Sequence, residues 1–187
     1  MNDAAGVADG SARWEILISK DKLDRDLAAL AGGLAARQWR GVIGVANGGI
    51  YPAGRVADQL GLDYREIEIK AYRGRSKATL DIIRSMEDPG QGQGLLVVDD
   101  IVDSGDTALA IRRMLPKAAF LSVYAKAEGL RKLEVGGKPH LCAERFTQDV
   151  WIVFPWHQTG WAGDIPQSVA RYRAGQGLNK SIPITRQ

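Results

Sequence analysis

The sequence has a single cysteine, Cys142, so no disulfide can form within the chain. Small proteins of oxidising compartments commonly depend on disulfides, and the near absence of cysteine indicates a reducing compartment. No run of about 18 apolar residues occurs that would span a membrane. Residues 1–13 also lack the basic and then apolar order of a secretion signal. We therefore expect a cytoplasmic protein without a membrane span.

Metal-binding residues and excess charge are also scarce. The two histidines, His140 and His157, and Cys142 are too few and too irregularly spaced for a zinc site. The net charge is only +3, which is typical of a solvated surface. Residues 171–187 contain no acid, but a loosely ordered terminus accounts for them. Nucleic-acid binding is compatible with this composition and is not favoured by it.

What the sequence does contain is an alternation of short apolar strands with amphipathic helices. Strands are predicted over residues 41–46, 63–72, 94–100, 118–126, 138–146 and 150–154, and helices over residues 19–38, 51–61 and 107–115. Ser19 is the expected N-cap of the first helix, and Gly61 the expected end of the second. Such alternation predicts an α/β domain with a mainly parallel sheet flanked by helices. Ligands of such sheets bind at the carboxyl ends of the strands.

One long polar stretch interrupts this alternation. Residues 71–94 are basic and glycine-rich and lie between two predicted strands. An excursion of this length in a compact domain is usually a functional flap, and an ordinary flexible insertion is the alternative.

The segment "LLVVDDIVDSGDT", residues 95–107, contains the main candidate residues for ligand binding and catalysis. A strand followed by a small-residue loop and a helix N-terminus directs several backbone N–H groups at one point, which suits a phosphate. Ser104 and Thr107 add hydroxyl donors, and Gly105 lets the backbone approach the anion closely. The loop is therefore predicted to bind an anion.

Three aspartates accompany this loop. Asp99 and Asp100 lie at the predicted strand end, where at least one side chain reaches the ligand crevice. Carboxylates accept hydrogen bonds from sugar hydroxyls and hold Mg²⁺ through its water shell. Asp103 opens the loop, where it is placed to exchange a proton with a reacting group. Acids beside an anion loop indicate a ligand that carries both phosphate and ribose.

"VVDDIVDSGDT" resembles the phosphoribosyl-pyrophosphate signature of the type I phosphoribosyltransferase family, and the acid at position 103 resembles its 6-oxopurine branch. The segments "VIGVANGGIYPAGRVADQLG", "VYAKAEG" and "QDVWIVFPW" are similar in order and spacing to bacterial xanthine-guanine phosphoribosyltransferases. The similarity covers residues 14–160 or thereabouts. It implies the type I fold with a flexible hood loop around Tyr72.

The resemblance also implies a role for each site residue. Asp99 and Asp100 would meet the ribose hydroxyls and Mg²⁺, and Asp103 would face purine N7 as the catalytic base. The 5′-phosphate would be bound by Ser104, Gly105, Asp106 and Thr107. We expect the Asp106 side chain to point outward and cap the helix.

On the base side, the resemblance implies that Lys126 donates to the purine 6-oxo group, that Trp151 stacks on the base, and that the backbone of Ile152 meets its Watson–Crick edge. An ammonium group has donors only, so it distinguishes an oxo from an amino group. The alternatives are a solvated lysine at a strand end and core aromatics at Trp151 and Trp156; for Trp156 the core is the preferred reading.

Two positions depart from the family pattern. The pyrophosphate loop of the family usually carries Arg or Lys next to a non-proline cis peptide, whereas this chain has Asn47 and Gly48 there. An amide supplies no charge, so the flap residues Arg73, Arg75 and Lys77 are candidate substitutes. His157 stands where relatives usually place an acid, which leaves the preferred base open.

The predicted organisation is a flexible leader over residues 1–13, a phosphoribosyltransferase domain over residues 14–164 and a basic extension over residues 165–187. The implied reaction transfers ribose-5-phosphate from phosphoribosyl pyrophosphate to a 6-oxopurine: guanine, xanthine or hypoxanthine. A homo-oligomer, dimer or tetramer, is expected. The alternatives are a nucleotide-sensing or RNA-binding regulator of the same fold and an enzyme acting on another base.

Overall fold

A computed structural model describes residues 6–8, 14–69, 89–134, 140–158, 161 and 164–177. Its main sheet has the strand order β4-β3-β5-β6-β7 and every neighbouring pair is parallel. The strands are β3 (Gly41–Ala46), β4 (Tyr64–Glu68), β5 (Leu95–Val102), β6 (Ala119–Lys126) and β7 (Glu144–Phe146). The expected α/β class with a mainly parallel sheet is confirmed.

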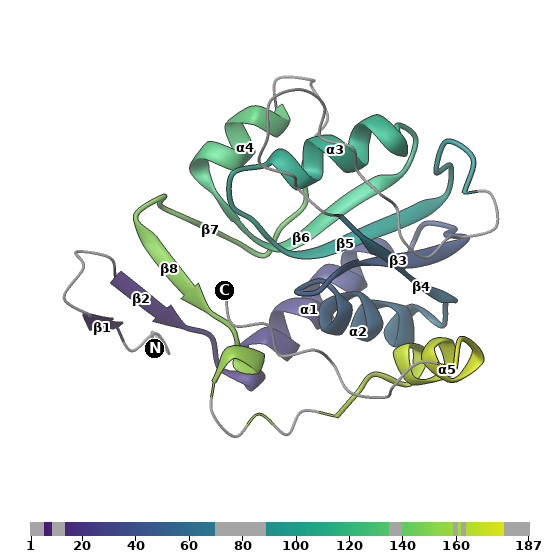
Figure 1. The fold of residues 1–187 in the computed structure, drawn as a ribbon, viewed down its shortest axis with the longest axis horizontal. Helices are drawn as coiled ribbons and strands as arrows, with labels where there is room; N and C mark the ends of the chain where they lie inside the picture. Colours follow the sequence, from purple (N-terminus) through teal and green to yellow (C-terminus); the bar gives the residue numbers. More distant parts are fainter. Residues whose placement is uncertain are drawn as a thin grey trace.

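Helices cover both faces of this sheet (Figure 1). The helices α1 (Lys20–Leu34) and α2 (Ile50–Leu60) pack on one face, and α3 (Asp106–Met114) and α4 (Ala127–Glu134) pack on the other. Alternate β5 side chains enter the two cores: Leu96 and Val98 join the first, and Leu95 and Val97 join the second. Burial on both faces explains why the strand is a continuous apolar run.

Local sequence signals fix the ends of the first two helices. The Ser19 hydroxyl accepts a hydrogen bond from the Lys22 N–H, so Ser19 is the N-cap of α1 as predicted. Gly61 ends α2 with φ 65°, a left-handed conformation that glycine adopts without steric cost. The leucine stripe of α1 is buried in the first core.

A second, three-stranded sheet lies beside the main one (Figure 1). It consists of β1 (Gly6–Ala8), β2 (Trp14–Leu17) and β8 (Val150–Val153). β2 pairs antiparallel with β1 and parallel with β8. The strand predicted at "VWIVF" is thus present as β8, but it belongs to this small sheet and not to the main one.

The C-terminal part is more ordered than its composition predicts. Residues Gln167–Gly175 form α5, so the loosely ordered terminus expected over residues 171–187 is wrong for residues 171–175. The Asp58 carboxylate accepts from the N–H groups of Gln167 and Ser168 at the start of α5. Arg173 forms a buried two-pronged pair with Glu66 of β4, at 2.8 and 3.3 Å. These contacts fasten α5 to α2 and to the sheet edge.

Several predictions fall outside the described residues. They concern Tyr72, Arg73, Arg75 and Lys77 of the flap, together with most of residues 71–94. Among the residues that the structure describes, no helix is both long and apolar enough to cross a membrane.

Candidate functional site

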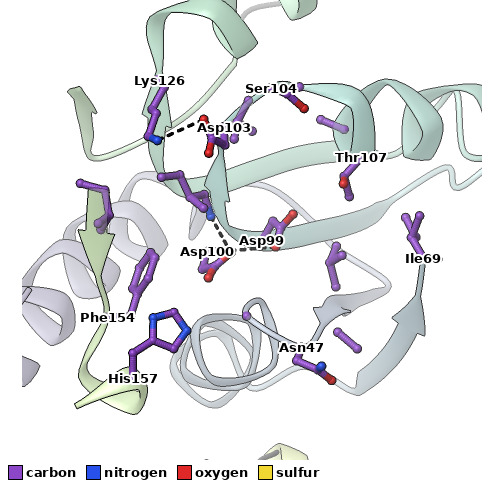
Figure 2. Close-up of a pocket in the computed structure, with 18 of the residues that line it drawn as sticks. Asn47, Ile69, Asp99, Asp100, Asp103, Ser104, Thr107, Lys126, Phe154 and His157 are labelled. Carbon is purple, nitrogen blue, oxygen red and sulfur yellow. Dashed lines mark hydrogen bonds and ion pairs between the residues drawn. The ribbon is translucent and has the colours of Figure 1, made fainter. Parts of the chain in front are cut away.

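A cavity of about 320 Å³ opens where the carboxyl ends of β3, β5 and β6 meet β8. Figure 2 shows its walls: Asn47 and Ile69 lie on one side, Lys126 and Asp103 on the other, and Phe154 and His157 along β8 and the turn after it. All but one of the predicted site residues that the structure describes line this cavity, Asp106 being the exception. The order of the sheet therefore gathers four separate segments at one place.

The β5–α3 loop has the geometry that its small residues predicted. Gly105 is the residue before α3 and has φ 81°, and a Cβ there would lie 2.9 Å from the carbonyl oxygen of Gly129 in α4. A side chain at position 105 would therefore be strained and would collide with α4. Ser104, Gly105 and Thr107 all line the cavity at the N-terminus of α3, the end of a helix that attracts anions.

Asp106 points away from the cavity, as predicted, but it does not cap the helix. Its side chain is 74% exposed and pairs with Lys132 of α4 at 3.1 Å. The Ser104 hydroxyl donates to the Asp106 carboxylate and accepts from the Asp106 N–H. The N-cap of α3 is Gly105, so the predicted capping role of Asp106 is wrong. Lys132 lowers the pKa of Asp106, with a further contribution from Ser104.

Asp99 and Asp100 both line the cavity, although neighbouring residues of a strand normally point to opposite faces. Asp99 accepts from the Asp100 N–H at 3.0 Å, and Asp100 accepts from the Ile101 N–H at 2.8 Å. Burial, together with the adjacent Asp100 carboxylate, raises the pKa of Asp99 well above its usual range. Burial also raises the pKa of Asp100. Burial of the two carboxyl groups thus makes their ionisation less favourable than in water.

This pair has the donor chemistry of a Mg²⁺ site. Among the described residues, no cationic side chain pairs with Asp99 or Asp100, and no cluster of three His, Cys, Asp or Glu side chains occurs. Mg²⁺ binds through one or two carboxylates, keeps several waters and takes its other ligands from substrate phosphates. Two carboxylates without a cationic partner among the described residues, beside the β5–α3 loop, fit that pattern.

Asp103 is held by two donors from different elements. Lys126 of β6 places Nζ 3.2 Å from Asp103 Oδ1, and Gln148 donates to the same oxygen at 2.8 Å. Gln148 is fixed in turn, because its Oε1 accepts from the N–H of Glu128. The Lys126 side chain is 5% exposed and that of Asp103 is 46% exposed. The carboxylate is therefore accessible to a ligand while its orientation is set from the protein side.

Aromatic and apolar side chains of β8 and of the turn after it line another part of the cavity. Lys126 Nζ lies 6.0 Å from the centre of the Trp151 ring, so cation and ring share one part of the cavity. Trp151 is half-buried, and Ile152 is buried beside it. Trp156 is a core residue, as preferred from the sequence, and stacks on Phe154 with ring centres 4.7 Å apart.

The loop after β3 contains a cis peptide between Ala46 and Asn47. A Cβ added to Gly48 would overlap the Asp100 carboxyl group, so the lack of a side chain at Gly48 lets the loop approach the acid pair without displacing Asp100. Asn47 and Gly48 both line the cavity, and Asn47 contributes an amide group, which carries no charge.

His157 enters the cavity from the short 3₁₀ turn η1 (Pro155–His157). Its ring meets those of Phe154 and Trp156 edge-on. Burial lowers the pKa of His157, so the imidazole is neutral at physiological pH. His157 thus offers the cavity a side chain that can donate and accept hydrogen bonds without a charge.

Three further residues belong to the site and were not identified from the sequence. Gln148 orients Asp103, Phe154 lines the cavity, and Gly129 lets α4 approach the loop. A Cβ at Gly129 would lie 2.5 Å from the Asp103 carbonyl oxygen. Gly129 and Gln148 lie within segments that carry the family resemblance, so the order of those segments was the available signal.

Comparison with known proteins agrees with this geometry. Residues 16–124 match the family described as "Phosphoribosyl transferase domain". A xanthine-guanine phosphoribosyltransferase of Chromohalobacter salexigens is 36% identical over 143 residues, covering 76% of this chain and 83% of that protein.

Two solved structures share the fold. A purine phosphoribosyltransferase from Pyrococcus horikoshii Ot3 is 23% identical, with a TM-score of 0.61 over 80% of this chain and 99% of that one. A hypothetical protein from Neisseria gonorrhoeae with bound ppGpp is 20% identical, with a TM-score of 0.62 over 87% and 98% of the two chains. The chain belongs to the phosphoribosyltransferase family and has its type I fold.

Proposed function

We propose that the protein is a purine-salvage phosphoribosyltransferase, which transfers ribose-5-phosphate from phosphoribosyl pyrophosphate to a 6-oxopurine and releases pyrophosphate. The observation that carries this proposal is the convergence in one cavity of an anion loop, two buried carboxylates and a Lys126–Asp103 pair. The identity of 36% to a xanthine-guanine phosphoribosyltransferase supports it.

The phosphate end of the substrate is assigned to the β5–α3 loop. Backbone N–H groups at the start of α3 and the hydroxyls of Ser104 and Thr107 would bind the 5′-phosphate. Asp106, which faces solvent, would contribute through its backbone only. Asp99 and Asp100 would accept hydrogen bonds from the ribose hydroxyls, and this replaces the hydration that burial has removed.

The base end is assigned to β6 and β8. Lys126 would donate to the 6-oxo group, Trp151 would stack on the ring, and the Ile152 backbone would meet its Watson–Crick edge. Stacking of a base on an aromatic side chain contributes roughly 1–3 kcal/mol. His157, neutral and close to Phe154, would face the base as a hydrogen-bonding group that carries no charge.

The reaction breaks the bond between the ribose anomeric carbon and pyrophosphate oxygen and forms a bond from that carbon to a purine nitrogen. The bonding electrons leave with pyrophosphate, and the base loses one proton. Asp103 would accept or share that proton at N7, in the orientation that Gln148 and Lys126 impose. Positioning and charge stabilisation would supply most of the rate.

Mg²⁺, held by Asp99 and Asp100 through its waters, would neutralise charge on the diphosphate. Asn47 and Gly48 would meet the pyrophosphate with an amide and a backbone N–H. The flap around Tyr72 would exclude water, which otherwise competes with the base. We also propose a homo-oligomer, dimer or tetramer, in a reducing cytoplasm; sedimentation of the purified protein tests its size.

The test is nucleotide formation from phosphoribosyl pyrophosphate, Mg²⁺ and each of guanine, xanthine, hypoxanthine and adenine. Turnover of one or more 6-oxopurines, with little for adenine, is expected. The Asp103→Asn variant should be slower with all of them while it keeps its fold. No nucleotide from any base would refute the proposal.

The uncharged Asn47 favours one alternative, a regulator of the same fold that binds a nucleotide without turning it over. Such a protein would bind nucleotide in the same cavity and form no product with any base. The Asn47→Arg variant separates the two functions, because it should improve the affinity of an enzyme for pyrophosphate but create no turnover in a regulator.

A further inference from the structure

A second cavity, of about 540 Å³, lies at the end of the main sheet where the strands begin, whereas the first cavity lies where they end. Its walls are the amino ends of β3, β4 and β5 and one side of α5. It shares no lining residue with the first cavity. Its volume lies in the range of small-molecule sites, and no part of the proposed reaction uses it.

Three arginines line this cavity: Arg40, Arg65 and Arg171. Among the lining residues that the structure describes, Asp63 is the only acid, so their charges sum to an excess of positive charge. Among the described residues, no carboxylate forms an ion pair with any of the three guanidinium groups. The cavity therefore concentrates cationic groups that the fold itself does not neutralise.

The guanidinium groups are partly fixed but retain donors. Arg40 donates one hydrogen bond to the Gln93 carbonyl at 3.1 Å, and Arg65 donates one to the Tyr64 carbonyl at 2.9 Å. The Arg65 guanidinium also lies 5.9 Å from the centre of the Tyr172 ring. A guanidinium group has five N–H donors in a rigid fork, so each keeps donors for another acceptor. Arg171, on α5, is exposed.

We propose that this cavity binds the oligophosphate group of a small ligand. Arginine forks match phosphate oxygens in a bidentate manner, and several adjacent phosphates would occupy several arginines at once. The same chemistry is presented by inorganic tripolyphosphate and by a nucleoside triphosphate. The cavity is large enough for either ligand.

The bound ligand would join α5 to the sheet. Arg171 and Tyr172 belong to α5, whereas Arg40 and Arg65 lie at the starts of β3 and β4. The buried Arg173–Glu66 pair already connects the same two elements nearby. Ligand binding should therefore slow amide hydrogen exchange in α5, and this protection should depend on Arg65 and Arg171.

The test combines calorimetric titration with hydrogen exchange, using tripolyphosphate and GTP separately. Wild type should bind at a site whose occupancy protects α5. The double variant Arg65→Gln/Arg171→Gln should lose this protection and bind about tenfold or more weakly, where tenfold corresponds to ~1.4 kcal/mol. Arg113→Gln removes an exposed arginine of α3 that lines neither cavity, and it is the matched control.

Protection by both ligands supports the proposal with phosphate as the recognised group. Protection by GTP alone supports a nucleotide ligand, and protection by tripolyphosphate alone supports an inorganic one. Equal binding by wild type and the double variant, or no protection of α5 by either ligand, overturns it. Turnover in the absence of added triphosphate should be the same in wild type and the double variant, so this test stands apart from that of the proposed reaction.

Discussion

Lys126 and Asp103 form an ion pair in which Lys126 Nζ lies 3.2 Å from Asp103 Oδ1. The two residues are assigned different chemical roles. The lysine comes from the end of β6 and the aspartate from the loop after β5, two strands that are paired in the sheet. In the free protein the ammonium group meets a carboxylate, and a 6-oxopurine would bring a second acceptor to it. Recognition of the base and orientation of the acid are therefore linked.

This link predicts the effect of Lys126→Met. The variant loses the donor to the 6-oxo group and one of the two donors that orient Asp103. We expect kcat/KM for 6-oxopurines to fall by about 100-fold or more, equivalent to ~2.7 kcal/mol. Steady-state kinetics with each base measures this. Lys117→Met, an exposed lysine that lines neither cavity, is the matched control and should behave as wild type. If kcat/KM for 6-oxopurines relative to adenine were the same in the variant and in wild type, the assigned role of Lys126 would be contradicted.

Gln148→Ala tests the second donor to Asp103. The side-chain amide of Gln148 donates a hydrogen bond of 2.8 Å that orients the Asp103 carboxylate, and Gln148 itself does not line the cavity. We expect kcat to fall by about tenfold, or ~1.4 kcal/mol, with little change in KM for phosphoribosyl pyrophosphate. Gln148→Glu should be slower still, because it places a second negative charge beside Asp103. A rise in KM alone would indicate a structural role instead.

Asp99→Asn should make the free protein more stable and less active. Because burial raises the pKa of Asp99, ionisation of this group costs folding free energy. Its contribution to stability is complete below the unfolded pKa of about 4 and is lost as pH rises through the higher folded value. The melting temperature of the variant should exceed that of wild type by a margin that grows from pH 4 to pH 8. A margin independent of pH would show that ionisation of buried Asp99 is not the cause.

Buried His140 should give the free energy of unfolding the opposite dependence on pH. The Ser122 hydroxyl donates to the Tyr124 carbonyl, so His140 Nε2 must donate to Ser122 Oγ, at 2.7 Å. In the part of the chain that the structure describes, the buried Nδ1 then has no hydrogen-bond partner, and a proton added there would meet no acceptor. Burial, with Arg112 and Arg145 nearby, lowers the pKa of His140 to about 4.

Because the folded pKa lies below the unfolded value of about 6.5, stability from neutral His140 is present above pH 6.5 and is lost as pH falls towards 4. Thermal melts between pH 4 and pH 7 should show this loss in wild type. In His140→Gln the curve should be flatter, and His157→Gln serves as the comparison. Identical slopes in wild type and His140→Gln would refute the assignment.

The shape of the β5–α3 loop was predictable because its parts are adjacent in the chain. β5, the glycine turn and the start of α3 follow one another over residues 95–107, so the local sequence defines the whole element. Asp99, Asp100 and Asp103 were identified on the same ground. The proximity of Lys126 followed from a general property of parallel sheets, whose strands end at one edge.

Contacts between distant segments were not predictable in this way. Gln148 and Asp103 are 45 residues apart, and nothing local to either residue indicates their hydrogen bond. The helix α4 is short and contains Gly129, which weakens its helical signal. The helix α5 contains few large apolar residues, and it is held by Asp58 and by the Arg173–Glu66 pair. Tertiary contacts decided these elements.

The outward direction of Asp106 was predictable from repulsion by a phosphate, but its bonding partner was not. Lys132 belongs to α4, which the sequence did not reveal as a helix. The capping role was assigned because aspartate often caps helices, yet Gly105 already occupies that position. Residue type indicated the kind of interaction, and the packing of α4 determined where it formed.

The most direct test of the account is a crystal structure with a 6-oxopurine 5′-nucleotide and Mg²⁺. The account predicts the 5′-phosphate on the N–H groups at the start of α3, the ribose hydroxyls on Asp99 or Asp100, and the 6-oxo group within hydrogen-bonding distance of Lys126. A nucleotide bound elsewhere, or a phosphate loop filled by the protein's own side chains at saturating nucleotide, would contradict it.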